Sequence, residues 1–307
     1  MSTRSSRSEA GSSSLSRVDA GAGATEDSSP TQPRDRRPRD STVRMSSAKH
    51  RRGLVRPLSL VSIVSLLAAI GIWQLISTYF VSPLFLPSPI SVGKGIGTLW
   101  RSGQLQTDAG ISLARILTGW AIGSLIGAPI GFAVGTSQFV KALVDPFIHF
   151  FRFVPALALV SVFMVWLGVG ETAKVALIVY ATAFLVTVTT ATGVSAVPDD
   201  KIFAARCLGA RPLYLLLHVH IPAAVPHIYT AMRLALANAF LVIIAVEIVA
   251  ANSGLGYLIW NSRIYFQTTW MFAGVIAIGV LGLASDRIWR QVGRTVLKRY
   301  VGAASRY

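Results

Sequence analysis

The chain has 307 residues, of which 52% are hydrophobic and 14% are charged, and its mean hydropathy is +0.56. Soluble domains carry about 25% charged residues, so this composition excludes an ordinary soluble protein and indicates an integral membrane protein. The formal net charge of +16 could suit a nucleic-acid partner, but the positions of the cations give it another origin, described below. The single cysteine, Cys207, excludes an internal disulfide.

The N-terminal segment 1–56 is rich in Ser, Arg, Asp and Pro. It has too few large apolar side chains to offset the entropy of ordering, so we predict a disordered basic tail at 1–56, followed by a transmembrane domain at 57–307. Arg51 and Arg52 stand before an apolar run, as in a twin-arginine export signal. That run is too long for a signal peptide and has no Ala-x-Ala cleavage site, which favours a retained anchor.

The first predicted span is Leu58–Phe80, which contains no charge and is close to the ~20 residues needed to cross a bilayer. An amphipathic helix is predicted after it at Val92–Trp100. We expect this connection to lie on the membrane surface.

The second predicted span, Ile111–Val134, contains glycines at intervals of four residues. Residues four apart share one face of a helix, so this face has no side-chain bulk and a neighbouring helix can pack against it backbone to backbone. The glycines are Gly119, Gly123, Gly127, Gly131 and Gly135.

The third segment has two possible starts. Phe153–Gly168 is short for a span, whereas Phe147–Gly168 would include Arg152 and Pro155. A short hydrophobic segment interrupted by proline is one indicator of a transport pathway, so both residues are candidate pathway residues. We expect Arg152 to face the bundle interior; the alternative is an arginine that reaches the cytoplasmic headgroups.

Three further spans are predicted at Thr172–Val197, at about Ile228–Ala250 and at Trp270–Ile288. Arg115 in the second span and Glu247 in the fifth would both lie near the same membrane surface. Because either charge alone is costly in a membrane, we predict that the two form a structural ion pair.

Six spans place both chain termini on one side, and the positive-inside rule identifies that side as the cytoplasm. The opposite face has four cations, at positions 94, 101, 174 and 263. The basic charge is therefore explained by topology and needs no nucleic-acid partner. The cations on the cytoplasmic face are Arg51, Arg52, Arg56, Lys141, Arg152, Lys201, Arg206, Arg211, Arg287, Arg290, Arg294, Lys298, Arg299 and Arg306.

A polar stretch, Pro198–Pro222, separates the fourth and fifth spans and contains clear helix boundaries. Asp199 or Asp200 can cap a helix at 201–208, and Gly209 suits the left-handed position that ends it. Pro212 prevents simple continuation. We therefore predict a short helix, a turn and a second short helix.

This stretch resembles the cytoplasmic loop of permease subunits from bacterial ATP-binding-cassette importers. Ala204-Ala205, then Gly209 and then Val219-His220-Ile221-Pro222 match the spacing of that family's loop, with Phe203 in place of the usual acid. In the family the loop forms a coupling helix that docks on the ATPase subunit. The resemblance implies a set of ATPase-coupling residues in this chain: Asp200, Phe203, Ala204, Ala205, Gly209 and Pro222.

Four other stretches are similar to the nitrate, sulfonate and taurine branch of these permeases, and the resemblance covers roughly residues 58–300. They are SLARILTGW at Ser112–Trp120, VWLGVGETAKV at Val165–Val175, AMRLALANA at Ala231–Ala239 and IVAANSGLGYLIW at Ile248–Trp260. The resemblance implies a plasma-membrane homodimer that receives its solute from an extracytoplasmic substrate-binding protein. A separate ATPase subunit would drive transport of a nitrate, sulfonate, taurine or unrelated small solute.

Chemistry within the chain itself is not indicated. No G-x-x-x-x-G-K-[ST] loop for nucleotide binding is present. His218, His220 and His227 lack a cysteine or carboxylate in matching geometry, so we expect no metal and no cofactor. Two alternatives remain: an integral-membrane enzyme, for which the acids are too scattered, and a passive channel without an ATPase.

The sequence thus predicts an all-α membrane bundle of about six transmembrane helices with a cytoplasmic coupling helix, preceded by a disordered tail.

Overall fold

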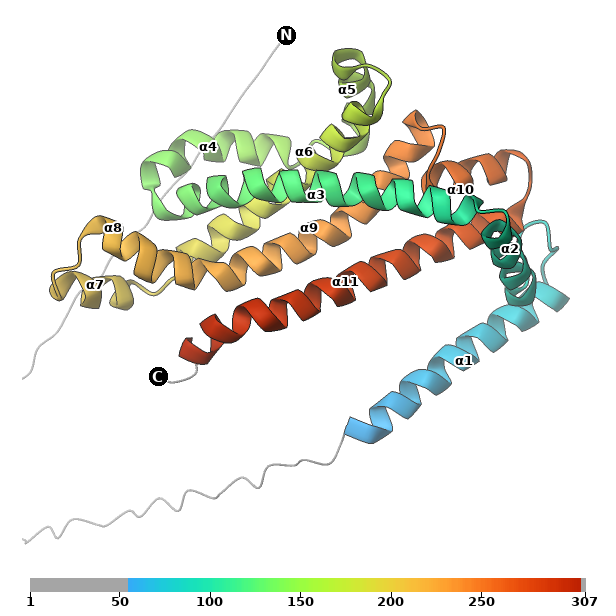
Figure 1. Ribbon diagram of the computed structural model, residues 1–307, viewed down its shortest axis with the longest axis horizontal. Coiled ribbons are helices and arrows are strands. Elements are labelled where there is room, and N and C mark those ends of the chain that lie inside the picture. The colour runs from blue at the N-terminus through green and yellow to red at the C-terminus, as the bar shows by residue number, and fades with distance from the viewer. Residues whose placement is uncertain (1–54, 305–307) are drawn as a thin grey trace, which may run out of the picture. The chain divides into compact units, whose positions relative to one another are not determined.

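The structure is a computed structural model that describes residues 55–304, and these residues form helices and connecting turns without any strand (Figure 1). The tail predicted at 1–56 lies outside the described residues as far as residue 54. The helices in chain order are α1 (Val55–Tyr79), α2 (Pro89–Arg101), α3 (Gln104–Thr136), α4 (Gln138–Phe151), the 3₁₀ turn η1 (Ala156–Leu159), α5 (Val160–Leu167), α6 (Glu171–Ser195), α7 (Asp199–Cys207), α8 (Pro212–Leu215), the π-helical turn η2 (Leu216–His220), α9 (Ile221–Ala250), α10 (Leu255–Ile264) and α11 (Thr268–Ala304).

Within the described residues, five helical segments are long and apolar enough to cross a membrane. They are α1, α3, α6, the run from α8 to α9, and α11. A sixth crossing is added when α4 and the η1–α5 segment, which are bent by 85° at a short break, are counted together. The all-α bundle of about six spans is therefore confirmed.

The third segment matches neither predicted start, because α4 already begins at Gln138 and the helix breaks between Phe151 and Ala156. Pro155 explains the break, since proline has no N–H and disfavours helical geometry in the residue before it. The Tyr180 hydroxyl donates to the carbonyl oxygens of Phe151 at 2.8 Å and of Val154 at 3.2 Å. The carbonyl of Phe151 also accepts from the N–H of Val154 at 3.0 Å, so the bond to the carbonyl of Val154 is the one that satisfies an acceptor freed by the break.

The glycine-lined face of α3 packs against α6, as predicted. A Cβ atom on Gly127 would collide with the carbonyl oxygen of Ala183 in α6, and the other four glycines meet α6 in the same way. The hydroxyl of Thr187 donates across this contact to the carbonyl of Gly127 at 3.2 Å. α3 and α6 therefore touch backbone to backbone along most of their lengths.

Aromatic side chains pack α3, α9 and α11 together in the half of the bundle that carries α7. The Tyr229 ring stacks on Trp289 with centroids 5.5 Å apart, and the Trp120 ring meets Trp289 edge-on at 4.8 Å. The Trp120 indole also donates to the carbonyl oxygen of Met232 at 2.8 Å. α1, by contrast, is peripheral, because most of its side chains from Val61 onward are exposed.

The contact between α3 and α6 predicts that Gly127→Ala destabilises the protein. The new methyl group would press on backbone rather than on a flexible side chain, and overpacking of this kind costs about 1–3 kcal/mol. The measurement is the fraction of detergent-extracted protein that stays monodisperse after heating.

Gly110→Ala is the matched control, because Gly110 lies in the same helix and no atom comes within 4 Å of the place that its Cβ would occupy. It should be neutral or slightly stabilising, since alanine is the better helix former. Equal losses in both variants would show that the glycine face does not set the packing.

Candidate functional site

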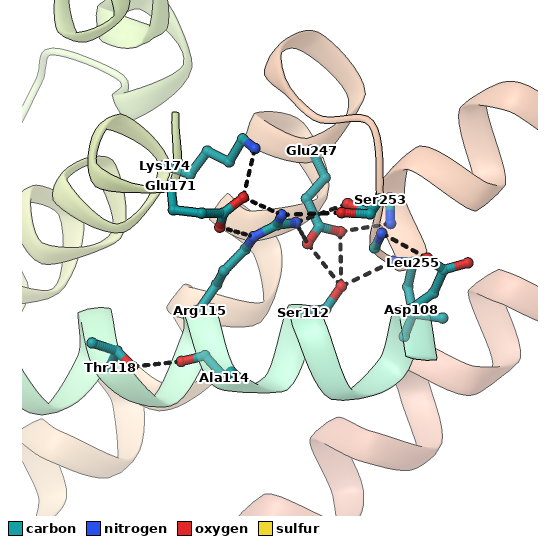
Figure 2. Close-up of polar contacts among 12 residues, drawn as sticks. Asp108, Ser112, Ala114, Arg115, Thr118, Glu171, Lys174, Glu247, Ser253 and Leu255 are labelled. Atoms are coloured by element: carbon teal, nitrogen blue, oxygen red, sulfur yellow. Dashed lines mark hydrogen bonds and ion pairs between the residues drawn. The ribbon is translucent and has the colours of Figure 1, made fainter. Parts of the chain in front are cut away.

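A partly buried cluster of charged side chains (Figure 2) lies beside the start of α10, at the end of the bundle opposite α7 (Figure 1). Arg115 of α3 is at its centre, with a side chain only 4% exposed. Its Nη1 donates to Glu247 Oε1 at 2.7 Å, and its Nε donates to Glu171 Oε2 at 2.6 Å. Lys174 Nζ donates to the same Glu171 carboxylate at 2.9 Å. The structure thus brings the predicted partners Arg115 and Glu247 together and adds Glu171 and Lys174.

The carboxylate of Glu247 also fixes the start of α10. It accepts hydrogen bonds from the Ser112 hydroxyl at 2.8 Å and from the backbone N–H of Gly256 at 2.8 Å, and its side chain is fully buried. Asp108 accepts from the backbone N–H of Gly254 at 2.8 Å. Gly254 is required here because its φ is +113° and a Cβ atom would collide with the Glu247 carboxylate.

α10 and the roles of Asp108 and Ser112 were not predicted from the sequence. Asp108 and Ser112 lie four residues apart on α3, and Arg115 follows three residues later, so the three polar side chains share one helical face. That spacing was the available signal. The hydrogen bonds of the cluster connect α3, α6, α9 and α10. Arg115 and Glu247 are buried, so the cluster leaves no room for a solute.

A groove beside the break in the third segment is the second candidate site. Arg152 and Pro155 line a cavity of about 390 Å³ together with Tyr180 of α6 and Asn238 of α9. Arg152 is exposed in the single chain, where it opens onto this groove and is not enclosed by its own bundle. The physical reason is the 85° bend, which turns the residues of the break toward the surface.

The third candidate site is the loop between α6 and α8. α7 spans Asp199–Cys207, and Pro198 occupies the position before its first turn, so the predicted capping role of Asp199 or Asp200 is wrong. Both acids lie inside the first turn, where a negative charge still suits the positive end of the helix dipole.

The end of α7 agrees with the prediction for Gly209, whose φ is +79°. The backbone N–H of Gly209 donates to the carbonyl of Arg206 at 2.9 Å, and that of Ala210 donates to Ala205 at 3.1 Å. This pair of hydrogen bonds is the Schellman motif, which requires a left-handed residue at the glycine position.

The second short helix predicted after Gly209 is not separate. α8 continues through the π-helical turn η2 into α9, so that Pro212–Ala250 forms one continuous helical run and Pro222 lies in the first turn of α9. Proline removes a backbone N–H from this run, and the irregular π-helical turn lies directly before it.

Apolar side chains are exposed around α7. The exposed fraction is 59% for Phe203, 89% for Leu208 and 66% for Leu213. Ala204 is exposed and Ala205 half-buried, and a cavity of about 400 Å³ lies beside Gly209 and Tyr214. Exposed large apolar side chains gathered on a polar loop are typical of a contact surface for another protein.

Comparison with known proteins identifies similar chains. Residues 123–298 match the family described as binding-protein-dependent transport system inner membrane component. A putative aliphatic sulfonates transport permease of Bacillus subtilis is 33% identical over 258 residues, which cover 83% of this chain and 91% of the relative. A taurine transport system permease of Escherichia coli is 33% identical over 227 residues, covering 72% of this chain and 82% of the relative.

A solved structure described as an amino acid ABC transporter with histidines has the same fold. Its TM-score is 0.53 at 19% identity, and the match covers 66% of this chain and 97% of the other.

The buried cluster predicts that Arg115→Ala destabilises the protein by about 3–5 kcal/mol, because it leaves the buried Glu247 without a cation. Glu247→Ala should also destabilise it, because Ser112 and the N–H of Gly256 lose their buried acceptor, although Arg115 keeps its ion pair with Glu171. The double variant should lose less than the sum of the two single variants. Thermal stability of the detergent-extracted protein measures all three.

Arg233→Ala is the control, since the Arg233–Asp286 pair has side chains 42% and 30% exposed. Exposed pairs contribute about 1 kcal/mol or less. Strictly additive losses for Arg115 and Glu247 would mean that the two charges do not depend on each other.

Proposed function

The chain belongs to the family of binding-protein-dependent transport system inner membrane components, and on that premise we propose that it forms the path for a sulfonate-type anion. It is a multi-pass permease subunit of an ATP-binding-cassette importer. Membership of the family implies two partners, an ATPase subunit that hydrolyses ATP and a substrate-binding protein. The chain itself is the non-enzymatic membrane component.

The proposal for the solute rests on two relatives whose names specify sulfonates and taurine. Both solutes carry a sulfonate group, a compact oxyanion with three acceptor oxygens. Arg152 in the groove suits such a group, because its guanidinium can donate two parallel hydrogen bonds to an oxyanion. Nitrate is the alternative anion that the same side chain could bind.

We further propose that α7 docks on the ATPase. The observation that carries this proposal is the exposed apolar surface of Phe203 and Leu208 on a segment between two spans, with Leu213 exposed at the start of the following span. The small side chains of Ala204 and Ala205 allow close approach of a partner surface. Asp200 and Pro222 frame this surface at its two ends.

The permease would work as a homodimer with both chain termini in the cytoplasm. The groove beside Arg152 is open in the single chain, and a charge facing lipid is costly, so a second copy is the natural cover for it. The orientation follows from the excess of Lys and Arg at the end of the bundle that carries α7.

Deletion of the gene should abolish growth on taurine or ethanesulfonate as the sole sulfur source, and a plasmid copy should restore it. Growth on sulfate is the control. Normal growth on both sulfonates, together with lost growth on nitrate as the nitrogen source, would contradict the sulfonate assignment.

The docking proposal predicts that Gly209→Val yields a stably inserted permease that imports nothing. A left-handed conformation costs a residue with a Cβ atom about 1–2 kcal/mol, so the Schellman motif should fail and α7 should be misaligned. Solute uptake and copurification of the ATPase are the measurements. Gly209→Asn is the matched control, because asparagine tolerates this conformation and there is open space around Gly209.

An independent test uses Cys207, which is exposed on α7. A cytoplasmic thiol reagent should modify it rapidly in the permease alone and slowly when the ATPase is bound. Equal rates in both states, with normal uptake by Gly209→Val, would refute docking through α7.

A further inference from the structure

The arginines that lie deep in the spans differ in their partners. Arg115 is paired with two glutamates, and Arg233 donates to Asp286 Oδ1 at 2.6 Å. Arg152 forms no ion pair with any described residue and instead lies over the ring of Phe153, with its Cζ 4.7 Å from the ring centroid. Its guanidinium is therefore available to a ligand.

The depth of Arg152 makes this availability significant. Its cavity is lined by Tyr180, nine residues after Glu171 in α6, and by Asn238, nine residues before Glu247 in α9. At 1.5 Å per residue, both lie about 13 Å inside the end of the bundle that holds the charged cluster. A hydrocarbon core is about 30 Å thick, so these two lining residues place the cavity within the spans, where a charge requires water or a counter-ion.

Tyr180 holds this arginine in place. Its hydroxyl donates to the carbonyl oxygens of Phe151 and Val154, the two residues that flank Arg152 and Phe153. These bonds fix both ends of the four-residue break. Because the Phe153 ring belongs to the same break, the guanidinium and the ring beneath it are positioned together.

A polar stripe on α4 continues the groove from Arg152 toward the end of the bundle that carries α7. Lys141, Asp145, His149 and Arg152 are separated by four, four and three residues, so they share one face of the helix. All four line a second cavity of about 450 Å³, whose other wall is α6. Arg152 and Val188 line both cavities, which makes the two spaces adjoining.

We infer that the groove between α4 and α6 is the inner half of an anion route, in which Arg152 determines specificity and Tyr180 is its positioning residue. Lys141 and His149 continue the route toward the cytoplasm, and Asp145 between them limits how tightly an anion is held, as release requires. The inference rests on the proposed function, since it assigns residues to the transport of an anion.

The test measures the charge preference of the groove by chemical modification of a cysteine rather than by solute uptake. Val188→Cys is placed in a Cys207→Ser background, and the full transporter is assayed in inverted membrane vesicles. The rates of modification by an anionic reagent, 2-sulfonatoethyl methanethiosulfonate, and by its cationic trimethylammonioethyl counterpart are compared as a ratio.

The ratio should favour the anionic reagent, and Arg152→Gln should lower it by about tenfold, the lower end of the effect of focused charge on association rates. Arg152→Lys should keep most of the preference because the charge remains. Tyr180→Phe, which keeps the ring but removes both hydrogen bonds, should lower the ratio while leaving the rate of the cationic reagent unchanged or higher.

Arg263→Gln is the matched control. Arg263 lies over the Trp260 ring, with its Cζ 4.8 Å from the centroid, but lines neither cavity. Its substitution should leave the ratio unchanged. The inference would be overturned if Arg152→Gln left the ratio unchanged, or if Arg263→Gln lowered it equally.

The outcomes separate this inference from the proposed function. A ratio that depends on Arg152 in a transporter that does not import sulfonates would support the anion route and refute the sulfonate assignment. Normal sulfonate uptake with a ratio that Arg152→Gln does not change would support the sulfonate assignment and refute the anion route.

Discussion

The close contact between α3 and α6 is the interaction on which the other features depend. Glycines on α3 remove the side chains that would separate the two backbones, and the α6 hydroxyl of Thr187 donates across the contact. This proximity brings Arg115 within hydrogen-bonding distance of Glu171 at the first residue of α6. It also fixes the position of Tyr180, whose hydroxyl holds the break in the third segment. The glycine face of α3 therefore supports both the charged cluster and the groove.

The second organising constraint is that a polar group inside a membrane needs a partner. Glu247 meets this requirement with a guanidinium, a hydroxyl and a backbone N–H, and the acceptors at the break meet it with Tyr180. Arg152 has no counter-ion among the described residues, and it has an aromatic ring below it and an open groove around it. A group that departs from a rule obeyed by its neighbours is where function is expected.

The features that depend on helix periodicity and on local backbone chemistry could be predicted from the sequence. The glycine face of α3 and the left-handed Gly209 follow from spacing and from backbone chemistry alone. The sequence showed that proline interrupts the third segment, but neither its start at Gln138 nor the 85° angle of the bend follows from local pattern. The joining of α8 to α9 was not predicted either, since the sequence indicated a separate short helix. The roles of Asp108 and Ser112 could not be predicted, because their partners are backbone N–H groups at the start of α10, more than 130 residues away along the chain.

The helical run Pro212–Ala250 connects the proposed docking loop to the groove. Its first residues follow α7, Asn238 lines the cavity beside Arg152, and Glu247 near its far end is fixed by the charged cluster. A displacement of α7 would therefore move the near end of this run while the far end stays anchored. The π-helical turn Leu216–His220 lies near the α7 end of this run, and such turns are often found at functional sites. The geometry thus places the least regular part of the run next to α7 and the part with the most buried polar contacts at the other end.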